Sequence, residues 1–520
     1  MKIGIDVGGT NTDSVLLQDN TVLAGVKAPT ATNVAAGIVD SLTKLKEQYP
    51  FSGSEIEAVI IGTTHFINAL VEANRLAPTA AIRLGLPATR GLPPFVGWPD
   101  RLRDAVRARH YLCHGGHEFD GREISKLNPD EIRAAVHDAA EHGVRSFAVS
   151  SVFSPVNSEF EVETAAIIES VVPDAAISLS HEIGRVGLLE RENATIINAA
   201  LRALSVEVCA SLEESLQAFD ITAPLFLSQN DGTLMDVDYA RRYPVATFAS
   251  GPTNSMRGAA FLSGLTDCMV VDVGGTTTDV GVLQAGYPRE AATEIEVAGV
   301  RTNFRMPDVS SIGLGGGSRV HQDNGILVGP DSVGYRISSE AMVFGGSTLT
   351  ATDVAVGLGF AEVGDRSLVQ GLEKSTLVAA KKRIDAMMAE VVDRMRTSAT
   401  PLPVVAVGGG SILVPGKIPG VSSVIRPENA GVANAIGAAV AQVGGEVDRI
   451  YPVPPGARNE VLDSARAEAV EKAVAAGAEP STIAVVEVDE LPLAYLPGNA
   501  ARIRVKAVGD LAVARPGTTY

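Results

Sequence analysis

The sequence has few cysteines and few aromatic residues. Three of its 520 residues are cysteine, their number is odd, and they lie far apart at Cys113, Cys209 and Cys268. Such spacing excludes a disulfide framework and provides no paired cysteines for a structural zinc site. Aromatic residues make up 5% of the chain, whereas 52 residues are glycine. We therefore expect an α/β protein with many tight turns between strands and helices.

Long apolar segments and a basic charge are also missing. No segment approaches the roughly 20 apolar residues that a membrane-spanning helix needs. Residues 1–6 run directly into an apolar strand, without the features of a secretory signal. We therefore expect a cytoplasmic protein with no membrane partner. The formal net charge of −18 argues against a nucleic-acid partner, because nucleic-acid binding requires a basic surface.

The length and the hydrophobic content predict several domains. With 520 residues, of which 46% are hydrophobic, the chain is too long for a single core. A long helix predicted at 188–216 marks the main boundary, and a proline-rich connector near Tyr451 precedes a final unit. We predict an N-terminal domain at 1–187, a second domain at 188–445 and a small C-terminal α/β unit at 446–520.

Two segments, residues 4–13 and 272–279, follow one pattern: an apolar strand ending in Asp, a Gly-Gly-Thr turn, and a second strand with a second Asp. Glycines let backbone N–H groups approach phosphate oxygens, threonine hydroxyls add donors, and a carboxylate can hold Mg²⁺ directly or through water. One such turn is common in ordinary hairpins. Two copies indicate an internal duplication that binds a nucleotide.

Two later segments follow in an informative order. Residues 405–411 form an apolar strand that ends in glycines, a turn that could lie against adenosine, although a plain turn explains it equally well alone. Residues 429–443 are predicted as a helix of small residues that packs closely on another helix. The whole order resembles the actin-like ATPase superfold, which serves several unrelated functions. The predicted fold is α/β, with duplicated ribonuclease H-like domains around a central nucleotide cleft.

Four further segments, at 62–70, 180–199, 250–252 and 315–319, resemble the A subunits of hydantoinases and 5-oxoprolinases, a group that includes ATP-dependent lactamases and some ketone carboxylases. The resemblance extends from Met1 to about Val443. It implies that the γ-phosphoryl of ATP is transferred to the carbonyl oxygen of a cyclic amide. This transfer would activate the amide carbon, which is otherwise a poor electrophile, toward attack by water. It also implies a B subunit that completes hydrolysis. Since no such region follows residue 520, we expect a separately encoded partner and an oligomer.

On this resemblance Asp6 and Asp272 are the predicted catalytic residues and Mg²⁺ ligands, while Asp13 and Asp279 only cap the hairpin turns. Residues 315–319, together with Thr350, Thr352 and Asp353, would line the same cleft, although a helix start explains the last three equally well. Residues 408–411 would face the adenosine. The residues predicted to bind the nucleotide are Gly8, Gly9, Thr10, Asn11, Thr12, Gly274, Gly275, Thr276, Thr277, Gly315, Gly316, Gly317, Gly408, Gly409, Gly410 and Ser411.

The substrate residues are predicted at two helix starts. Thr63, Thr64 and Asn68 could bind a carbonyl or carboxylate, and a simple N-cap is the alternative. In the second group Arg191 could steady an anion and surface ion pairing is the alternative; this group comprises Glu190, Arg191 and Asn193.

The segment Cys113-His114-Gly115-Gly116-His117 has too few ligands for zinc. It also departs from the longer members of the family.

Two other functions remain open at this point. The first hairpin resembles small-molecule kinases of the sugar-kinase type as well as it resembles hydantoinases, and a kinase would yield a stable phosphorylated product. A non-enzymatic ATP-driven clamp would bind unfolded peptides in a nucleotide-dependent way. The sequence does not distinguish hydantoin, oxoproline, caprolactam or a carboxylated ketone as the substrate.

Overall fold

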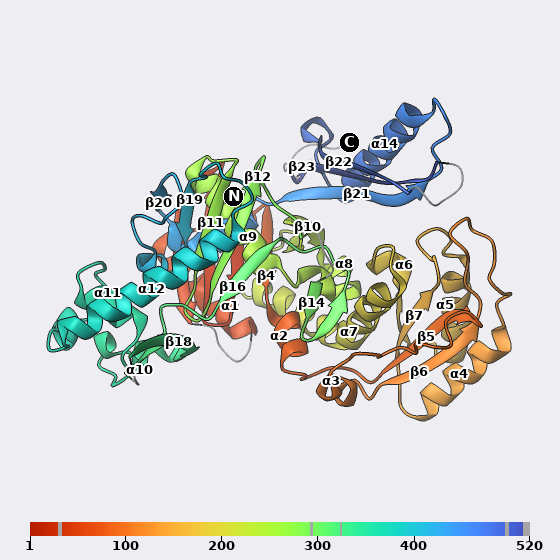
Figure 1. The fold of residues 1–520 in the computed structure, drawn as a ribbon, viewed down its shortest axis with the longest axis horizontal. Coiled ribbons are helices and arrows are strands. Elements are labelled where there is room, and N and C mark those ends of the chain that lie inside the picture. The colour runs from red at the N-terminus through yellow and green to blue at the C-terminus, as the bar shows by residue number, and fades with distance from the viewer. Residues whose placement is uncertain (30–33, 292–294, 323–324, 494–498, 513–520) are drawn as a thin grey trace.

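The computed structural model describes residues 1–29, 34–291, 295–322, 325–493 and 499–512. In Figure 1 the two hairpin-bearing sheets lie together on the left, a smaller α/β domain lies at the lower right, and the C-terminal unit lies at the upper right. The chain therefore forms a duplicated centre with two attached units.

The first sheet has nine strands in the order β22-β23-β21-β10-β9-β4-β1-β2-β3. Helices α1 (Val34–Gln48) and α7 (Leu188–Gln217) contact each other beside it. The core between these elements is built from the aliphatic side chains that alternate along the strands. The strands on the N-terminal side are β1 (Lys2–Val7), β2 (Asn11–Gln18), β3 (Thr21–Pro29), β4 (Ala58–Thr63), β9 (Leu225–Ser228) and β10 (Thr233–Asp236).

The second sheet repeats the plan of the first. Strand β11 (Cys268–Val273) runs antiparallel to β12 (Thr278–Gln284) and parallel to β19 (Val404–Val407), just as β1 runs antiparallel to β2 and parallel to β4. Helices α11 (Ala351–Gly357) and α12 (Lys374–Met395) cover it and share its core. The predicted duplication is therefore visible in the sheet topology.

A four-stranded parallel sheet, order β6-β5-β7-β8, is inserted between α2 (His65–Val71) and α7. It has its own hydrophobic core with two helices, α4 (Pro129–Glu141) and α5 (Glu159–Val171). We call this unit the inserted domain. Its strands are β5 (Thr79–Leu86), β6 (Arg109–His114), β7 (Ser146–Ser151) and β8 (Ala176–Leu179).

The predicted boundary after residue 187 does not separate the sheets. Strand β9 lies beyond that boundary yet pairs with β4, so residues 188–236 complete the first sheet. The C-terminal unit also continues this sheet, because β21 pairs with β10. Which residues belong to the first sheet depends on pairing between segments that are far apart along the chain, and local sequence patterns do not predict that pairing. The C-terminal elements are β21 (Gln442–Tyr451), α14 (Arg458–Ala475), β22 (Ala484–Pro492) and β23 (Ala501–Gly509).

The helix predicted at 429–443 is shorter than expected. Helix α13 spans Ala433–Ala439, and strand β21 begins at Gln442. A Cβ at Gly445 would lie 2.2 Å from the carbonyl oxygen of Ala469, so the chain leaves the helix to pack its backbone against α14. The predicted close packing is correct: a Cβ at Gly437 would lie 1.8 Å from the carbonyl oxygen of Asn254 on α9 (Ser250–Ser263).

Within the residues that the structure describes, one helix, α7, is long and apolar enough to cross a membrane by length and composition, contrary to the expectation from the sequence. However, 67% of its most apolar window is buried inside the molecule. The apolar character of α7 is thus explained by the core that it forms with α1 and the first sheet.

Candidate functional site

The two hairpin turns have the same local structure. The N–H of Gly8 donates to the carbonyl of Asn11 at 3.0 Å, and the N–H of Gly274 donates to that of Thr277 at 2.9 Å. The strand registers also match, pairing Asp6 with Asp13 and Asp272 with Asp279. The two halves therefore present the backbone of this turn in the same way.

The two turns meet at their tips. A Cβ at Gly275 would lie 3.2 Å from the side chain of Thr10, so the second hairpin touches the first. Because each turn ends a strand of a different sheet, the two turns mark the junction between the halves, where the sequence predicts the nucleotide cleft. This arrangement agrees with the predicted nucleotide cleft.

A hydrogen-bonded bridge joins Asp6 to Asp272. The amide of Asn434 on α13 donates to Asp6 Oδ2 at 3.3 Å, and its Oδ1 lies 2.7 Å from the hydroxyl of Ser255 on α9. The Ser255 hydroxyl also contacts Asp272 Oδ2. The crossing of α9 and α13 thus sets the relative position of the two carboxylates.

Burial perturbs these carboxyl groups. Burial and, second, the charge of Asp13 raise the pKa of Asp6 to about 7, although the Asn434 amide opposes the shift. Burial also raises the pKa of Asp272, against the hydrogen bond from Ser255. Two carboxyl groups that are costly to ionise favour a cationic partner.

Lys27 on β3 supplies a positive charge to the cleft. Its ammonium lies 2.5 Å from Asp13 Oδ2. Its positive charge partly offsets the rise that burial causes in the pKa values of Asp6, Asp13 and Asp272. The lysine stem passes the glycine turn of β19, since a Cβ at Gly409 would lie 3.6 Å from Lys27 Cε. Lys27 is therefore a candidate phosphate-binding residue.

Both glycine segments predicted for the nucleotide pack on the second hairpin. The N–H groups of Gly316 and Gly317 donate to the carbonyls of Gly274 and Gly275 at 2.9 and 2.7 Å. On the other side, Gly408 has a φ of +83° and a Cβ there would lie 2.2 Å from Asp272 Oδ1. Only glycine fits such a position. The structure thus brings 315–317 and 408–411 to the cleft, while contact with adenosine stays a prediction.

Asp6 and Asp272 fit a Mg²⁺ ion that is bound together with a nucleotide. In the part of the chain that the structure describes, no group of three His, Cys, Asp or Glu side chains could enclose a metal ion. Mg²⁺ bound with ATP needs only one or two carboxylates beside phosphate oxygens and water. Asp6 and Asp272 meet that requirement, and Asp13 Oδ1 is a buried oxygen that has no hydrogen-bond partner in the protein.

Thr63, Thr64 and Asn68 lie beside the first hairpin. Thr63 pairs with Val7 across β4 and β1, and the N–H of Thr64 donates to the carbonyl of Val7 at 3.4 Å. The hydroxyl of Thr63 accepts from the N–H of His65 at 3.2 Å, and Asn68 donates to Thr64 at 3.3 Å. Thr64 is the N-cap residue of α2 but its side chain makes no cap hydrogen bond, so the N-cap alternative is not met by a side-chain cap. The three residues are grouped near Asp6, and their contact with substrate stays a prediction.

The second predicted substrate group has structural contacts. Arg191 is 1% exposed and donates to the Ser180 hydroxyl at 2.9 Å and to the Ser151 carbonyl at 2.6 Å. Asn193 accepts from the indole N–H of Trp98 at 2.8 Å. Glu190 lies 3.8 Å from the guanidinium of Arg301, as the ion-pair alternative expects. These bonds fasten the start of α7 to its neighbours, and substrate binding by this group stays a prediction.

Two other segments have structural roles. Thr350 and Asp353 form a capping box at the start of α11, and Thr352 bonds the carbonyl of Gly316, so the helix-start alternative is correct. Cys113 is buried in the core of the inserted domain. His117 stacks on Phe160 at 4.4 Å between ring centroids, which accounts for the Cys-His segment without zinc.

Sequence reasoning missed four residues of the cleft: Lys27, Asn254, Ser255 and Asn434. Asn434 left a weak signal, because it is a polar residue within a run of small ones. Asn254 is fully buried, and neither atom of its amide has a hydrogen-bond partner. It lies beside Asp6, since a Cβ at Gly62 would be 2.4 Å from its Nδ2 and 2.7 Å from Asp6 Oδ1.

Comparison with known proteins identifies relatives of both halves. Residues 2–172 match the hydantoinase/oxoprolinase N-terminal region, and residues 191–402 match the hydantoinase/oxoprolinase domain. Caprolactamase subunit alpha from Pseudomonas jessenii is 27% identical over 423 residues, covering 76% of this chain and 59% of that protein. The chain spans between 53% and 61% of the length of the first four curated relatives it matches.

Solved structures share the fold. The ATP-dependent caprolactamase from Pseudomonas jessenii matches with a TM-score of 0.78 at 18% identity, covering 98% of this chain and 88% of that one. Nucleotide-free acetone carboxylase matches with a TM-score of 0.71 at 18% identity, covering 99% and 88%. The predicted α/β fold with duplicated halves is confirmed by the sheet topology, and these two structures share it. With two consecutive family regions in order on this fold, the chain belongs to the hydantoinase/oxoprolinase family.

Proposed function

We propose that the chain is the ATP-dependent subunit of a cyclic-amide hydrolase. It would transfer the γ-phosphoryl of Mg-ATP to the carbonyl oxygen of a substrate of the hydantoin, oxoproline or lactam type. The observation that carries the proposal is the pair of matching hairpins that meet at their tips, with Asp6 and Asp272 joined through Asn434 and Ser255. The similarity to caprolactamase subunit alpha supports the choice of substrate class.

The residues of the cleft can carry out the phosphoryl step by alignment and charge neutralisation. Backbone N–H groups of both turns hold phosphate oxygens, and Lys27 neutralises their charge. Mg²⁺, when bound by Asp6 and Asp272, would neutralise further phosphate charge and orient the γ-phosphoryl. The bond between the γ-phosphorus and the bridging oxygen breaks, a bond to the carbonyl oxygen forms, and ADP leaves with the electron pair.

Hydrolysis of the activated amide would involve a second, separately encoded subunit of the B type. The relative from Pseudomonas jessenii is named as the alpha subunit of its enzyme, which supports an assembly of several chains. Thr63, Thr64 and Asn68 would bind the substrate carbonyl, because they adjoin Val7 at the edge of the cleft.

The test is phosphate release in the presence of hydantoin, oxoproline or caprolactam, with and without the neighbouring gene product. At least one cyclic amide should stimulate ATP consumption, yielding free phosphate and, with the partner, a ring-opened product. A stable phosphorylated alcohol would instead identify a kinase. ATP consumption that no cyclic amide changes would contradict the proposal.

A further inference from the structure

A cavity of about 1000 Å³ lies where the inserted domain meets the first sheet and the C-terminal unit. Its walls come from α6 (Ser180–Ile183), the turn between β9 and β10, α8 (Val237–Arg242) and β21. Its volume is at the upper end of the range for small-molecule sites. Among the described residues that line it, none belongs to the predicted nucleotide or substrate sites.

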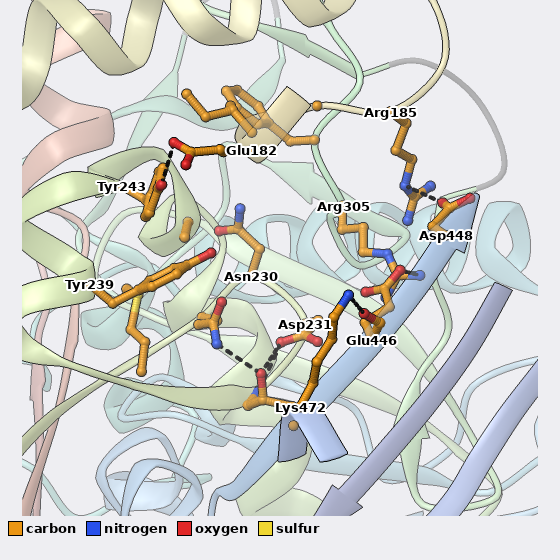
Figure 2. A pocket seen from close by; sticks show the side chains of 18 of the residues that line it. Glu182, Arg185, Asn230, Asp231, Tyr239, Tyr243, Arg305, Glu446, Asp448 and Lys472 are labelled. Carbon is orange, nitrogen blue, oxygen red and sulfur yellow. Dashed lines mark hydrogen bonds and ion pairs between the residues drawn. The ribbon is translucent and has the colours of Figure 1, made fainter. Parts of the chain in front are cut away.

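The charged groups at one end of this cavity neutralise one another. Lys506 lies 2.8 Å from Asp231, Arg185 lies 3.4 Å from Asp448, and Arg305 pairs with Glu446. Figure 2 shows Arg185, Arg305, Glu446 and Asp448 together on the side formed by β21. Since each of the lysines and arginines lining the cavity has an acidic partner, the lining favours a ligand without net charge.

The opposite end is polar and aromatic. Tyr243 donates from its hydroxyl to Glu182 Oε2 at 2.6 Å, and its ring stacks with Tyr239 at 4.5 Å between centroids. Figure 2 shows these three side chains on one side of the cavity, away from the ion pairs. The second carboxylate oxygen, Glu182 Oε1, lies 3.7 Å from the exposed guanidinium of Arg242 and is open to a further donor.

His181 adds an oriented donor to the same wall. Its Nδ1 lies 2.6 Å from Glu161 Oε2, and Glu161 is fully buried and also accepts from the N–H groups of Ser151 and His181. Burial alone would lower the pKa of His181, but the hydrogen bond and charge of Glu161 outweigh it and raise the pKa. With Nδ1 held by the carboxylate, Nε2 is the ring nitrogen left for a ligand, and it donates when the ring is protonated, the form that Glu161 favours.

A short chain of contacts links the cavity to the first hairpin. Asn230 lines the cavity and accepts from the N–H of Ala249 at 2.8 Å. The next residue, Ser250, bonds the backbone of Thr63 at 3.3 and 3.2 Å, and Thr63 pairs with Val7 beside Asp6. Since β9, β4 and β1 are parallel neighbours, their carboxyl ends meet at one edge of the sheet.

We propose that this cavity binds a neutral cyclic amide by its amide edge, with His181 Nε2 donating to the carbonyl oxygen and Glu182 accepting from the ring N–H. A ring amide presents one acceptor and one donor side by side, and its methylene groups would pack on the rings of Tyr239 and Tyr243. The ligand class rests on the proposed function. The cavity would hold the acceptor first, before its carbonyl oxygen passes to Thr63, Thr64 and Asn68 for the phosphoryl step.

The test is calorimetric titration of the full chain, without nucleotide, with 2-pyrrolidinone and with its N-methyl derivative, which lacks the N–H. His181→Asn keeps a group that can reach Glu161 but removes the distal donor, and Glu182→Met removes the acceptor. Each should raise the Kd for 2-pyrrolidinone at least about 10-fold. The N-methyl compound should bind wild type as weakly as 2-pyrrolidinone binds Glu182→Met. In Glu182→Met the two compounds should have similar Kd values.

Two matched variants serve as controls. His114→Asn alters an equivalent pair on the same domain, in which His114 Nδ1 lies 2.8 Å from Glu131, and should leave the Kd unchanged. Tyr243→Phe removes the hydrogen bond to Glu182 but not the acceptor, and it should retain binding. Unchanged affinity in both His181→Asn and Glu182→Met, or no lactam binding to wild type at millimolar concentration, would overturn the proposal.

Failure of this inference differs from failure of the proposed function. Asp272→Ala should lose nucleotide turnover yet retain 2-pyrrolidinone binding in the cavity. If cyclic amides stimulate ATP consumption but bind independently of His181 and Glu182, the cavity assignment is wrong and the proposed function stands. If they bind through these residues but never affect ATP consumption, the assignment stands and the proposed function is wrong.

Discussion

The two hairpins have the same backbone structure but different neighbouring side chains. Asp13 in the first hairpin pairs with Lys27, whereas Asp279, at the matching position of the second, receives the hydroxyl of Ser311. Similarly, Asp6 is bonded by the amide of Asn434 and Asp272 by the hydroxyl of Ser255. Duplication thus preserved the turn predicted to bind phosphate, while the surrounding side chains diverged and gave the positive charge to the first half.

The largest effect is expected from removing either strand-end aspartate. Asp6→Ala and Asp272→Ala should each lower ATP turnover by on the order of 100-fold or more, because each removes a predicted metal-binding carboxylate from a preorganised cleft. Phosphate release and calorimetric ATP binding provide the measurements. Equal losses would mean that the halves contribute alike, and undiminished turnover in Asp272→Ala would refute the nucleotide site.

The next largest effect is expected from a substitution where α9 crosses α13, because this crossing positions Asp6 and Asp272. Gly437→Ala should destabilise the chain by about 1–3 kcal/mol, since its Cβ would collide with the backbone of α9. Urea unfolding of the variant provides the measurement. Gly416→Ala is the control, because a Cβ there meets nothing within 4 Å. Equal midpoints for the two variants would show that α9 can move away from α13.

The asymmetry between the hairpins is tested by Lys27→Met. This change should raise the KM for ATP about 10-fold, since it removes a charge-assisted contact to phosphate and leaves Asp13 buried without its cation. Ser311→Ala is the matched change at the second hairpin and should alter the KM less. Steady-state kinetics on both variants provides the comparison, and a larger effect of Ser311→Ala would reverse the assignment of charge to the first half.

The smallest expected effect concerns pH. Burial raises the pKa of Asp279 from its ordinary 3.8 to about 6. The folded chain therefore holds this proton more tightly than the unfolded chain, and the resulting stabilisation is present at low pH and is lost as pH rises from about 4 to about 6. The Tm of wild type relative to Asp279→Asn should fall across this interval. A relative Tm that rises instead would contradict the shift.

Much of the fold could be predicted from local patterns. Both hairpins and helix α7 lie within a few residues of their predicted positions. Each depends on the spacing of apolar residues and on nearby turn residues. The helix predicted at 429–443 was too long, because pairing with β23 and packing on α14 override its local preference.

By itself the sequence determined the two turns and the aspartates that end their strands, since glycine spacing and strand alternation act over a few residues. Tertiary structure alone decided that Ser255 and Asn434 meet those aspartates and that Lys27 meets Asp13. It also decided that His181 and Glu182 line a cavity with Asp231 and β21. These residues are separated by up to several hundred positions along the chain, so only sheet pairing and helix crossing bring their side chains together.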